Sequence, residues 1–285
     1  MKPIIGAIAV ALSAGLGAAY AQELEITVAL PGGTTMEMVW IPPGTFTMGA
    51  PPGEANPQKY EDLQHQVTIT QGGYMGKYEL TQEQWESIMG TRPWAGLSFI
   101  IEKPRAPATY LSWDDGQEFI VKLNESKGTQ HYRLPTEAEW EYTCRAGTIT
   151  PWSFGTQDSL ITEYAWSHNN TWPFEPWCHE VGQKLPNPWG LYDMHGNAWE
   201  WVQDWYGDYE TAGGFIDPKG NPEGKFRVTR GGIFIAPPSG QRSASRDAGY
   251  PFYREGGAGI RVWREGAVYT AVEDHSWGVV KAGKR

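Results

Sequence analysis

The sequence predicts one domain in which helices and short strands are joined by many irregular loops. The chain has 285 residues, 40% of them hydrophobic, which supplies enough apolar material for a sizeable core. It contains 35 Gly and 21 Pro, more than is usual, and this favours a folded protein rich in turns. No period of 20 to 50 residues repeats, and no Ser/Gly or Pro-run linker divides the chain. One domain is therefore the simpler interpretation.

Capping signals predict three helices. Thr81 is followed three residues later by Gln84, and Thr136 by Glu139, so each pair matches a capping box. Ser112 is a third candidate cap. The predicted helices are Gln82–Met89, Trp113–Leu123 and Glu137–Ala146, the last closed by Gly147 as a left-handed residue.

Strands are predicted on both sides of these helices. Met36–Ile41 and Thr45–Met48 flank the turn Pro42-Pro43-Gly44, and Gln66–Thr70 alternates in polarity. No convincing long helix is predicted between Gly147 and Gly266. That region instead has two short strand candidates, Phe226–Arg230 and Ile260–Trp263.

Residues 1–21 have the features of a secretory signal peptide. Lys2 precedes the apolar stretch Ile4–Leu16, and Ala19-Tyr20-Ala21 stands before Gln22. An uncleaved anchor is the alternative, but the stretch is rich in Gly and Ala and short for a membrane span. We therefore expect a periplasmic or secreted protein with no stable membrane span after cleavage. Residues 266–285 are expected to be a C-terminal tail, either mobile or packed as a strand.

The chain has two cysteines, Cys144 and Cys178, so at most one disulfide forms. A Cys144–Cys178 bridge and two separate buried thiols are equally compatible with the spacing.

The charge distribution is uneven. The formal net charge of −10 disfavours nucleic acid as a partner, because an acidic surface does not attract phosphate backbones. Residues 225–264 nevertheless carry eight basic residues against two acidic ones. Either these arginines pair with acidic residues of earlier segments, or they form an anion-accepting floor of a binding cleft.

Several phrases occur in a fixed order along the chain. They are Met38–Pro42 with Phe46–Gly49, Tyr132–Tyr142, Asn187–Trp201, Arg230–Gly232, Arg242–Arg246 and Gly259–Arg261. Together they resemble the formylglycine-generating enzyme family, also called sulfatase-modifying factors, over residues 36–265. The resemblance implies a single asymmetric α+β domain with little regular secondary structure, distantly similar to the C-type lectin fold.

The resemblance also implies a calcium site in the loop before Trp201. Asp193 and Glu200 would supply side-chain oxygens, and Gly196 and Ala198 would supply main-chain carbonyls. All-oxygen ligation of this kind suits Ca²⁺. In the alternative, one of the carboxylates pairs with an arginine and no ion binds. The family's second, upstream calcium site is not matched by Trp166–Val181.

Family enzymes oxidise a substrate cysteine with O₂, using copper held by two thiolates after the Arg-Gly-Gly phrase. Thiolates are the ligands that Cu(I) prefers. The corresponding residues 230–242 contain no cysteine, and Ala236 stands where the first thiolate is expected, while Ile233 replaces the usual Ser. Cys144 matches a structural position. Copper is therefore not expected as a cofactor.

Three functions follow from this comparison. The first is an exported oxidative tailoring enzyme acting on a peptide-derived or small aromatic substrate, similar to pyoverdine-maturation proteins. The second is a non-catalytic module that binds a ligand or a protein partner at the cell surface, and the third is formylglycine formation on sulfatases. No residue is assigned a catalytic role; His195 stands inside the Asp193–Glu200 loop, but single histidines are usually structural. The cleft candidates are Arg230, Ile233, Phe234, Ala236, Arg242 and Arg246.

Overall fold

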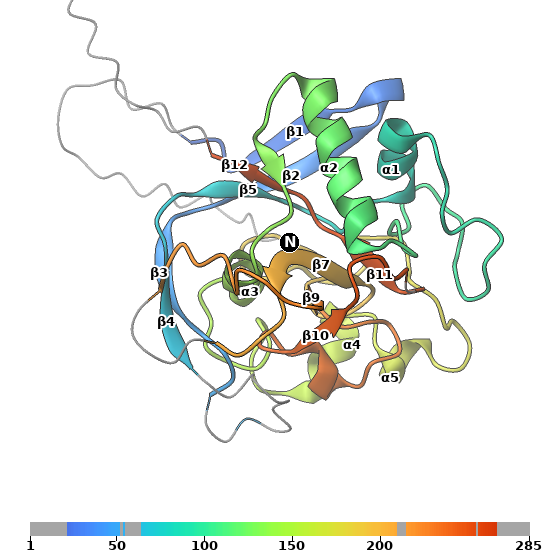
Figure 1. Ribbon diagram of the computed structural model, residues 1–285. Coiled ribbons are helices and arrows are strands. Elements are labelled where there is room, and N and C mark those ends of the chain that lie inside the picture. Colours follow the sequence, from blue (N-terminus) through green and yellow to red (C-terminus); the bar gives the residue numbers. More distant parts are fainter. Residues whose placement is uncertain (1–21, 52–53, 55–63, 210–214, 255, 267–285) are drawn as a thin grey trace, which may run out of the picture.

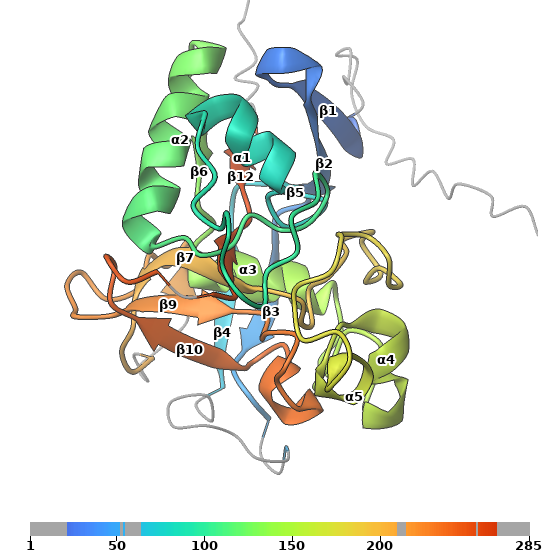
Figure 2. The same cartoon turned by 90° about the vertical axis from the view of Figure 1, so that its right-hand side faces the viewer.

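A computed structural model describes residues 22–51, 54, 64–209, 215–254 and 256–266. The predicted signal peptide and the tail from residue 267 onward lie outside the described residues. Within them the chain forms three sheets, three longer helices and several short helical turns, shown in two views (Figures 1 and 2). No helix of the described part is long and apolar enough to cross a bilayer.

The five-stranded sheet brings both ends of the domain together. Its strand order is β1-β2-β5-β12-β6, and every neighbouring pair is antiparallel. At residue 73 a Cβ atom would lie 2.2 Å from the Trp263 ring, so only glycine fits there. The strands are β1 (Glu25–Ala29), β2 (Thr35–Ile41), β5 (Gly73–Gly76), β12 (Trp263–Glu265) and β6 (Tyr132–Arg133).

Two smaller sheets complete the domain. The four-stranded sheet has the order β10-β9-β7-β11, with β11 parallel to β7, and the three-stranded sheet has the order β3-β4-β8, with β8 parallel to β4. Their strands are β7 (Trp199–Trp205), β9 (Arg227–Arg230), β10 (Arg246–Gly249), β11 (Ala258–Ile260), β3 (Gly44–Met48), β4 (His65–Ile69) and β8 (Phe215–Ile216).

The three predicted helices are confirmed, and each begins at its capping box. α1 (Gln82–Met89) has the predicted bounds, whereas α2 (Trp113–Lys127) continues one turn further, to a left-handed Gly128. α3 (Glu137–Arg145) ends one residue earlier than predicted, because Ala146 already adopts a left-handed φ of 46°. Gly147 is left-handed as well, with a φ of 88°. Two left-handed residues in succession cannot continue a helix.

Short helical elements replace any long helix after α3, as predicted for this part of the chain. They are η2 (Asp158–Leu160), α4 (Ile161–Tyr164), α5 (His168–Thr171) and η3 (Pro238–Gln241), and one further turn, η1 (Pro31–Gly33), lies between β1 and β2.

The strand Ile260–Trp263 was predicted wrongly. The chain instead forms β11 up to Ile260 and β12 from Trp263, and these strands belong to different sheets. The break occurs at Arg261, whose fully buried guanidinium group turns to the Glu200 carboxylate. The sequence also did not predict strands β1, β5, β6, β7, β8 and β10. In β7 the buried Glu200 and Asp204 hide the apolar character of the strand.

The tryptophans form much of the core. Trp85, Trp94, Trp140, Trp201 and Trp263 are all at most 1% exposed. Helix α3 contacts β3, β7 and β9, so it lies between the two smaller sheets and carries Trp140 into their shared core. The high Trp content therefore serves burial, at roughly 150 to 250 Å² for each aromatic side chain.

Candidate functional site

The loop after β9 is held in place by a glycine turn. Gly231 and Gly232 have φ angles of 95° and 87°, and a Cβ on Gly232 would lie 2.7 Å from the Gln241 side chain. Both positions therefore require glycine. The main-chain N–H of Phe234 donates to the Asn197 carbonyl over 2.9 Å, which ties the loop to the segment just before β7.

Helix α5 holds the other side of this loop. The His168 N–H donates to the Ala236 carbonyl over 3.1 Å, and the Thr171 hydroxyl donates to the Phe234 carbonyl over 2.8 Å. Phe234 itself is buried against Cys178 and Ala198. Of the predicted cleft residues in this loop, Ile233 and Ala236 are half-buried.

Sequence reasoning missed the side chains that make this surface apolar. Ile235 is 46% exposed, and Trp172 and Phe174, which follow α5, are 54% and 86% exposed. Because α5 is hydrogen-bonded to the loop at 233–241, the segments that carry these three residues lie next to each other. The sequence signal that could have predicted this surface is the large apolar pair around Pro173, in a stretch rich in turns.

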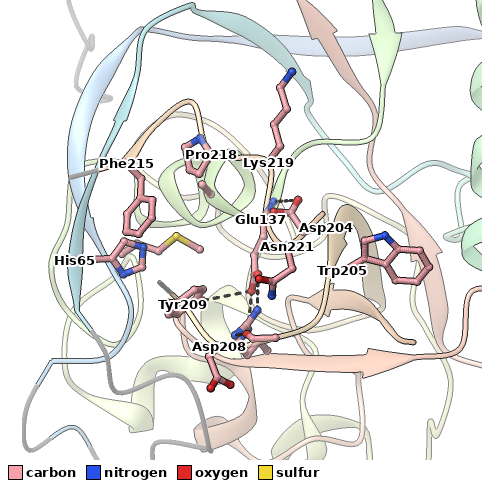
Figure 3. A pocket seen from close by; sticks show the side chains of 15 residues that line it. His65, Glu137, Asp204, Trp205, Asp208, Tyr209, Phe215, Pro218, Lys219 and Asn221 are labelled. Atoms are coloured by element: carbon pink, nitrogen blue, oxygen red, sulfur yellow. Dashed lines mark hydrogen bonds and ion pairs between the residues drawn. The ribbon is translucent and has the colours of Figure 1, made fainter. Parts of the chain in front are cut away.

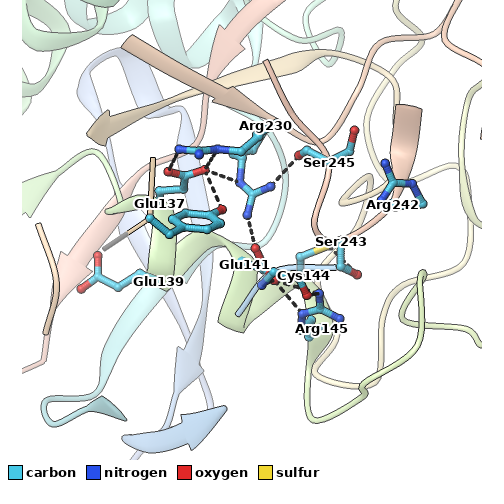
Figure 4. A network of polar contacts seen from close by, with 12 residues as sticks. Glu137, Glu139, Glu141, Cys144, Arg145, Arg230, Arg242, Ser243 and Ser245 are labelled. Atoms are coloured by element: carbon cyan, nitrogen blue, oxygen red, sulfur yellow. Dashed lines mark hydrogen bonds and ion pairs between the residues drawn. The ribbon is translucent and has the colours of Figure 1, made fainter. Parts of the chain in front are cut away.

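The three predicted arginines lie in buried ion pairs, and Figure 4 shows the contacts of Arg230. Arg230 bonds the Glu141 carboxylate, and its Nε lies 3.4 Å from Glu137. Arg246 binds Glu137 through two bonds of 2.6 and 2.8 Å. All of these side chains are at most 4% exposed.

Arg242 follows the same rule, since it bonds Glu54 and both side chains are 1% exposed. Burial alone would raise the pKa of Glu141, but Arg145 and Arg230 outweigh it and lower that pKa, so the carboxylate stays charged. These three arginines of the basic segment therefore pair with acidic residues of earlier segments. None of the three guanidinium groups is left for the anionic group of a ligand at this loop.

The predicted calcium residues lie around the start of β7: Asp193, Gly196 and Ala198 precede the strand, and Glu200 is its second residue. Asp193 and Asn197 adopt left-handed φ angles of 59° and 64°. Oδ2 of Asp193 accepts from the Gly182 N–H over 2.8 Å, whereas Oδ1 is buried and has no hydrogen-bond partner. Both oxygens of Glu200 accept from Arg261, and one also accepts from the Trp140 indole over 2.6 Å.

A third carboxyl group, which the sequence did not point to, lies beside them. Glu79 accepts from the Ala198 N–H over 2.8 Å and from the Asn197 amide over 2.6 Å. Its pKa is raised well above the ordinary value, first by burial and then by the charges of Asp193 and Glu200.

The cluster fits a cation in part. Three buried carboxyl groups lie near two cationic groups, Arg261 and Lys184, so positive charge is in deficit. The Asp193 Oδ1, which has no hydrogen-bond partner, offers a ligand atom. Both carboxylate oxygens of Glu200, however, already accept hydrogen bonds from Arg261. No group of three or more His, Cys, Asp or Glu side chains that could hold a metal is found in the described part of the chain.

Residues 27–266 match the family model described as "Sulfatase-modifying factor enzyme 1-like domain". The chain belongs to this family. The formylglycine-generating enzyme of Bos taurus is 27% identical over 280 residues, covering 76% of this chain and 71% of that protein. The enzyme of Thermomonospora curvata is 31% identical over 172 residues, covering 53% of each chain, so the match spans about half of that relative.

Solved structures of this fold agree with the assignment. PvdO from Pseudomonas aeruginosa is 29% identical with a TM-score of 0.74, and Treponema denticola variable protein 1 is 25% identical with a TM-score of 0.76. Each match covers 86% of this chain and 100% of the other. The predicted α+β sulfatase-modifying factor fold is thereby confirmed.

His195 is a core residue of this sulfatase-modifying factor domain. Its Nδ1 donates to the Gln241 carbonyl over 2.9 Å, and its Nε2 accepts from the Ser153 N–H over 3.0 Å. One donor and one acceptor describe a neutral imidazole. Burial accordingly lowers the pKa of His195 to about 4.

Both cysteines of the domain are free and buried. The Cys144 Sγ lies 3.8 Å from the His195 ring and 3.7 Å from the Ser243 hydroxyl, whereas Cys178 contacts the Asn197 carbonyl. Burial raises the pKa of Cys144 to about 12. Of the two alternatives that the spacing allows, the structure shows two separate thiols.

Proposed function

We propose that this protein is an exported oxidative tailoring enzyme that acts on a peptide-derived or small aromatic substrate. The observation that carries the proposal is the loop at residues 233–241, whose sequence differs from the family pattern. This loop contains no cysteine and exposes, fully or in part, Ile233, Ile235 and Ala236. The family model matches the chain over residues 27–266. The structural likeness to PvdO supports a role like that of the pyoverdine-maturation proteins.

Copper held by thiolates does not fit the residues present. Cys144 and Cys178 are buried, and they contact different partners, His195 and Ser243 on one side and Asn197 on the other. Thiolate formation is further opposed because burial raises the pKa of each thiol.

The proposed reaction removes two hydrogens from the substrate and transfers them to O₂, which leaves as H₂O₂. The loop surface would contribute positioning. The loop at 233–241 is hydrogen-bonded to α5. Exposed apolar side chains on these two segments, Ile235, Trp172 and Phe174, would pack against a planar ligand. Holding a reactant in one orientation is itself a large part of catalysis.

In the decisive experiment, purified protein comprising residues 22–285 is incubated with a panel of reduced aromatic and peptide-derived precursors. We expect O₂ consumption and a product lighter by two hydrogens in the mass spectrum. Trp172→Ala and Ile235→Asp should slow this turnover at least tenfold, whereas Ile149→Ala, also at an exposed apolar residue, should leave it unchanged. Unchanged substrates across the panel would refute an oxidase.

A ligand-binding or surface-assembly module is the second candidate, favoured by the same exposed apolar surface. The chaperone protein LppX of Paenibacillus barcinonensis is 27% identical over 211 residues. Saturable capture of a peptide or partner protein without O₂ consumption would support this function, and turnover would exclude it. Formylglycine formation on sulfatases is the third candidate. Co-expression with a sulfatase, followed by mass spectrometry for the aldehyde, tests it directly.

We also propose that Ca²⁺ binds at Asp193, Gly196, Ala198 and Glu200 as a structural ion. Support comes from the orphaned Asp193 oxygen and the excess of buried carboxyl groups. Export to the periplasm or the medium remains the prediction drawn from residues 1–21.

A further inference from the structure

A cavity opens beside the N-terminus of α3. No residue of the loop at 233–241 lines it, but Arg246, one of the predicted cleft residues, does. Its volume is about 190 Å³, which equals roughly six waters at ~30 Å³ each and suits one ring or a short chain. The three-stranded sheet, the end of β7 and the start of α3 form part of it (Figure 3). The segments that follow β7 and β8, together with Arg246 of β10, complete the lining.

One side of this cavity is aromatic. His65 of β4 lies between Tyr209 and Phe215, with ring centroids 4.8 and 4.9 Å apart. Met48 and Trp205 add further apolar surface. Faces of this kind attract organic cations as well as apolar groups.

The polar end of the cavity is the Asp204 carboxyl, which is 3% exposed. Its Oδ2 accepts from the Glu137 N–H at the start of α3 over 2.8 Å. No basic side chain of the described residues forms an ion pair with Asp204. The charged groups that face it are Glu137 and Glu139 of α3, Arg246 of β10 and Arg227 of β9.

The neighbouring cations are already engaged. Arg246 binds Glu137 through two bonds and donates a third to the Gly207 carbonyl. Arg227 donates to the Gln203 carbonyl and stacks on the Trp205 ring. In Figure 3 the amino group of Lys219 points away from the other labelled side chains. A buried carboxyl without a counter-ion is costly to ionise, and an incoming cation removes that cost.

We propose that this cavity binds a small organic cation, an ammonium group on an aromatic or aliphatic stem, with Asp204 as its counter-ion. The stem lies against Phe215, His65 and Tyr209. Asp204 releases its proton to solvent when the ammonium group binds. The pH dependence follows, because burial and then Glu137 raise the pKa of Asp204 to about 8.

Calorimetry on residues 22–285 with phenethylamine tests the proposal. We expect saturable binding that strengthens about 50-fold from pH 6 to pH 8, as the fraction of ionised Asp204 rises. The neutral analogue 2-phenylethanol and the anionic 3-phenylpropanoate should bind at least tenfold more weakly. A parallel titration with N-acetyl-lysine amide distinguishes a lysine side chain of a peptide from a free amine. The compound that binds more tightly identifies which of the two the cavity accepts.

Two variants and one control complete the test. Asp204→Asn keeps the acceptor for the Glu137 N–H but loses the charge, so it should weaken phenethylamine binding at pH 8 at least tenfold. Phe215→Ala should weaken binding of the stem, and Phe252→Ala, 69% exposed and outside the cavity, should not. No binding between pH 6 and 9, equal binding by Asp204→Asn, or tighter binding of the anion would overturn the proposal.

Discussion

At the scale of single residues, buried arginine–carboxylate pairs dominate the polar interior. Glu141 is fully buried and accepts from both Arg145 and Arg230, which come from α3 and β9. Such a pair is costly to desolvate, but removing one partner is worse, since it leaves an uncompensated buried charge. These pairs therefore explain how Arg230, Arg242 and Arg246 are accommodated inside the protein.

Glu141→Gln should destabilise the protein by about 3 to 5 kcal/mol, because two buried guanidinium groups lose their shared counter-ion. Arg254→Ala serves as the control: Arg254 is 46% exposed in its pair with Asp115, and its loss should cost at most about 1 kcal/mol. Urea unfolding monitored by Trp fluorescence measures both. Equal losses in the two variants would contradict the assignment.

Asp204 should make the protein less stable as pH rises. The folded-state pKa of about 8 lies above the ordinary value of 3.8, so between these values the unfolded chain has lost a proton that the folded one keeps. This group alone lowers the free energy of unfolding by up to about 1.4 kcal/mol per pH unit. Asp204→Asn should flatten the curve between pH 5 and 8. Asp247→Asn, at an exposed position, should follow the wild-type curve.

At the scale of elements, short local signals set the helices, while distant partners set the strands. Each of α1, α2 and α3 has both bonds of a capping box, formed within four residues. Strands β11 and β12, by contrast, are separated by two residues yet join different sheets. That break depends on Glu200, 61 residues away, which receives Arg261.

Thr136→Ala should destabilise the domain by about 1 kcal/mol, because the hydroxyl that accepts from the Glu139 N–H over 3.2 Å is lost. Thr136→Ser keeps that acceptor and should stay within about 0.5 kcal/mol of wild type. Thermal unfolding compares the two variants. If Ser were as damaging as Ala, the methyl group rather than the cap would be the cause.

At the scale of the whole molecule, the proposed sites lie where strands meet loops. The calcium residues lie around the start of β7, the loop at 233–241 follows β9, and Asp204 lies near the end of β7. A bound ion or ligand therefore acts on stability by mass action, because it binds the folded state and not the unfolded chain.

Calcium should raise the melting temperature, and EDTA should lower it. At a Ca²⁺ concentration of 100 times Kd the gain in unfolding free energy is about 2.7 kcal/mol. Asp193→Asn should lose most of this gain, whereas Asp247→Asn should retain it. Identical melting curves in Ca²⁺ and EDTA would rule out a structural calcium.

Both thiols should be unreactive in the folded protein and reactive once it unfolds, without a reductant. Cys144 and Cys178 are buried and free, and burial raises the pKa of each. Iodoacetamide labelling with and without urea, read by mass spectrometry, counts the modified residues. A chain that needs a reductant before it takes two labels would contain the disulfide instead.

The sequence by itself determined the family, the mixed helix and strand content, the three capped helices and the proximity of the proposed calcium residues. These features depend on short sequence motifs and on hydrogen bonds between residues a few positions apart, so they can be recognised in the sequence alone. Only the tertiary structure decided that Arg230, Arg242 and Arg246 are paired, that the cysteines are separate, and that Glu79 and Asp204 are buried carboxyl groups. Those outcomes depend on which distant segments share a desolvated space, because burial and charge pairing arise from packing across the whole chain.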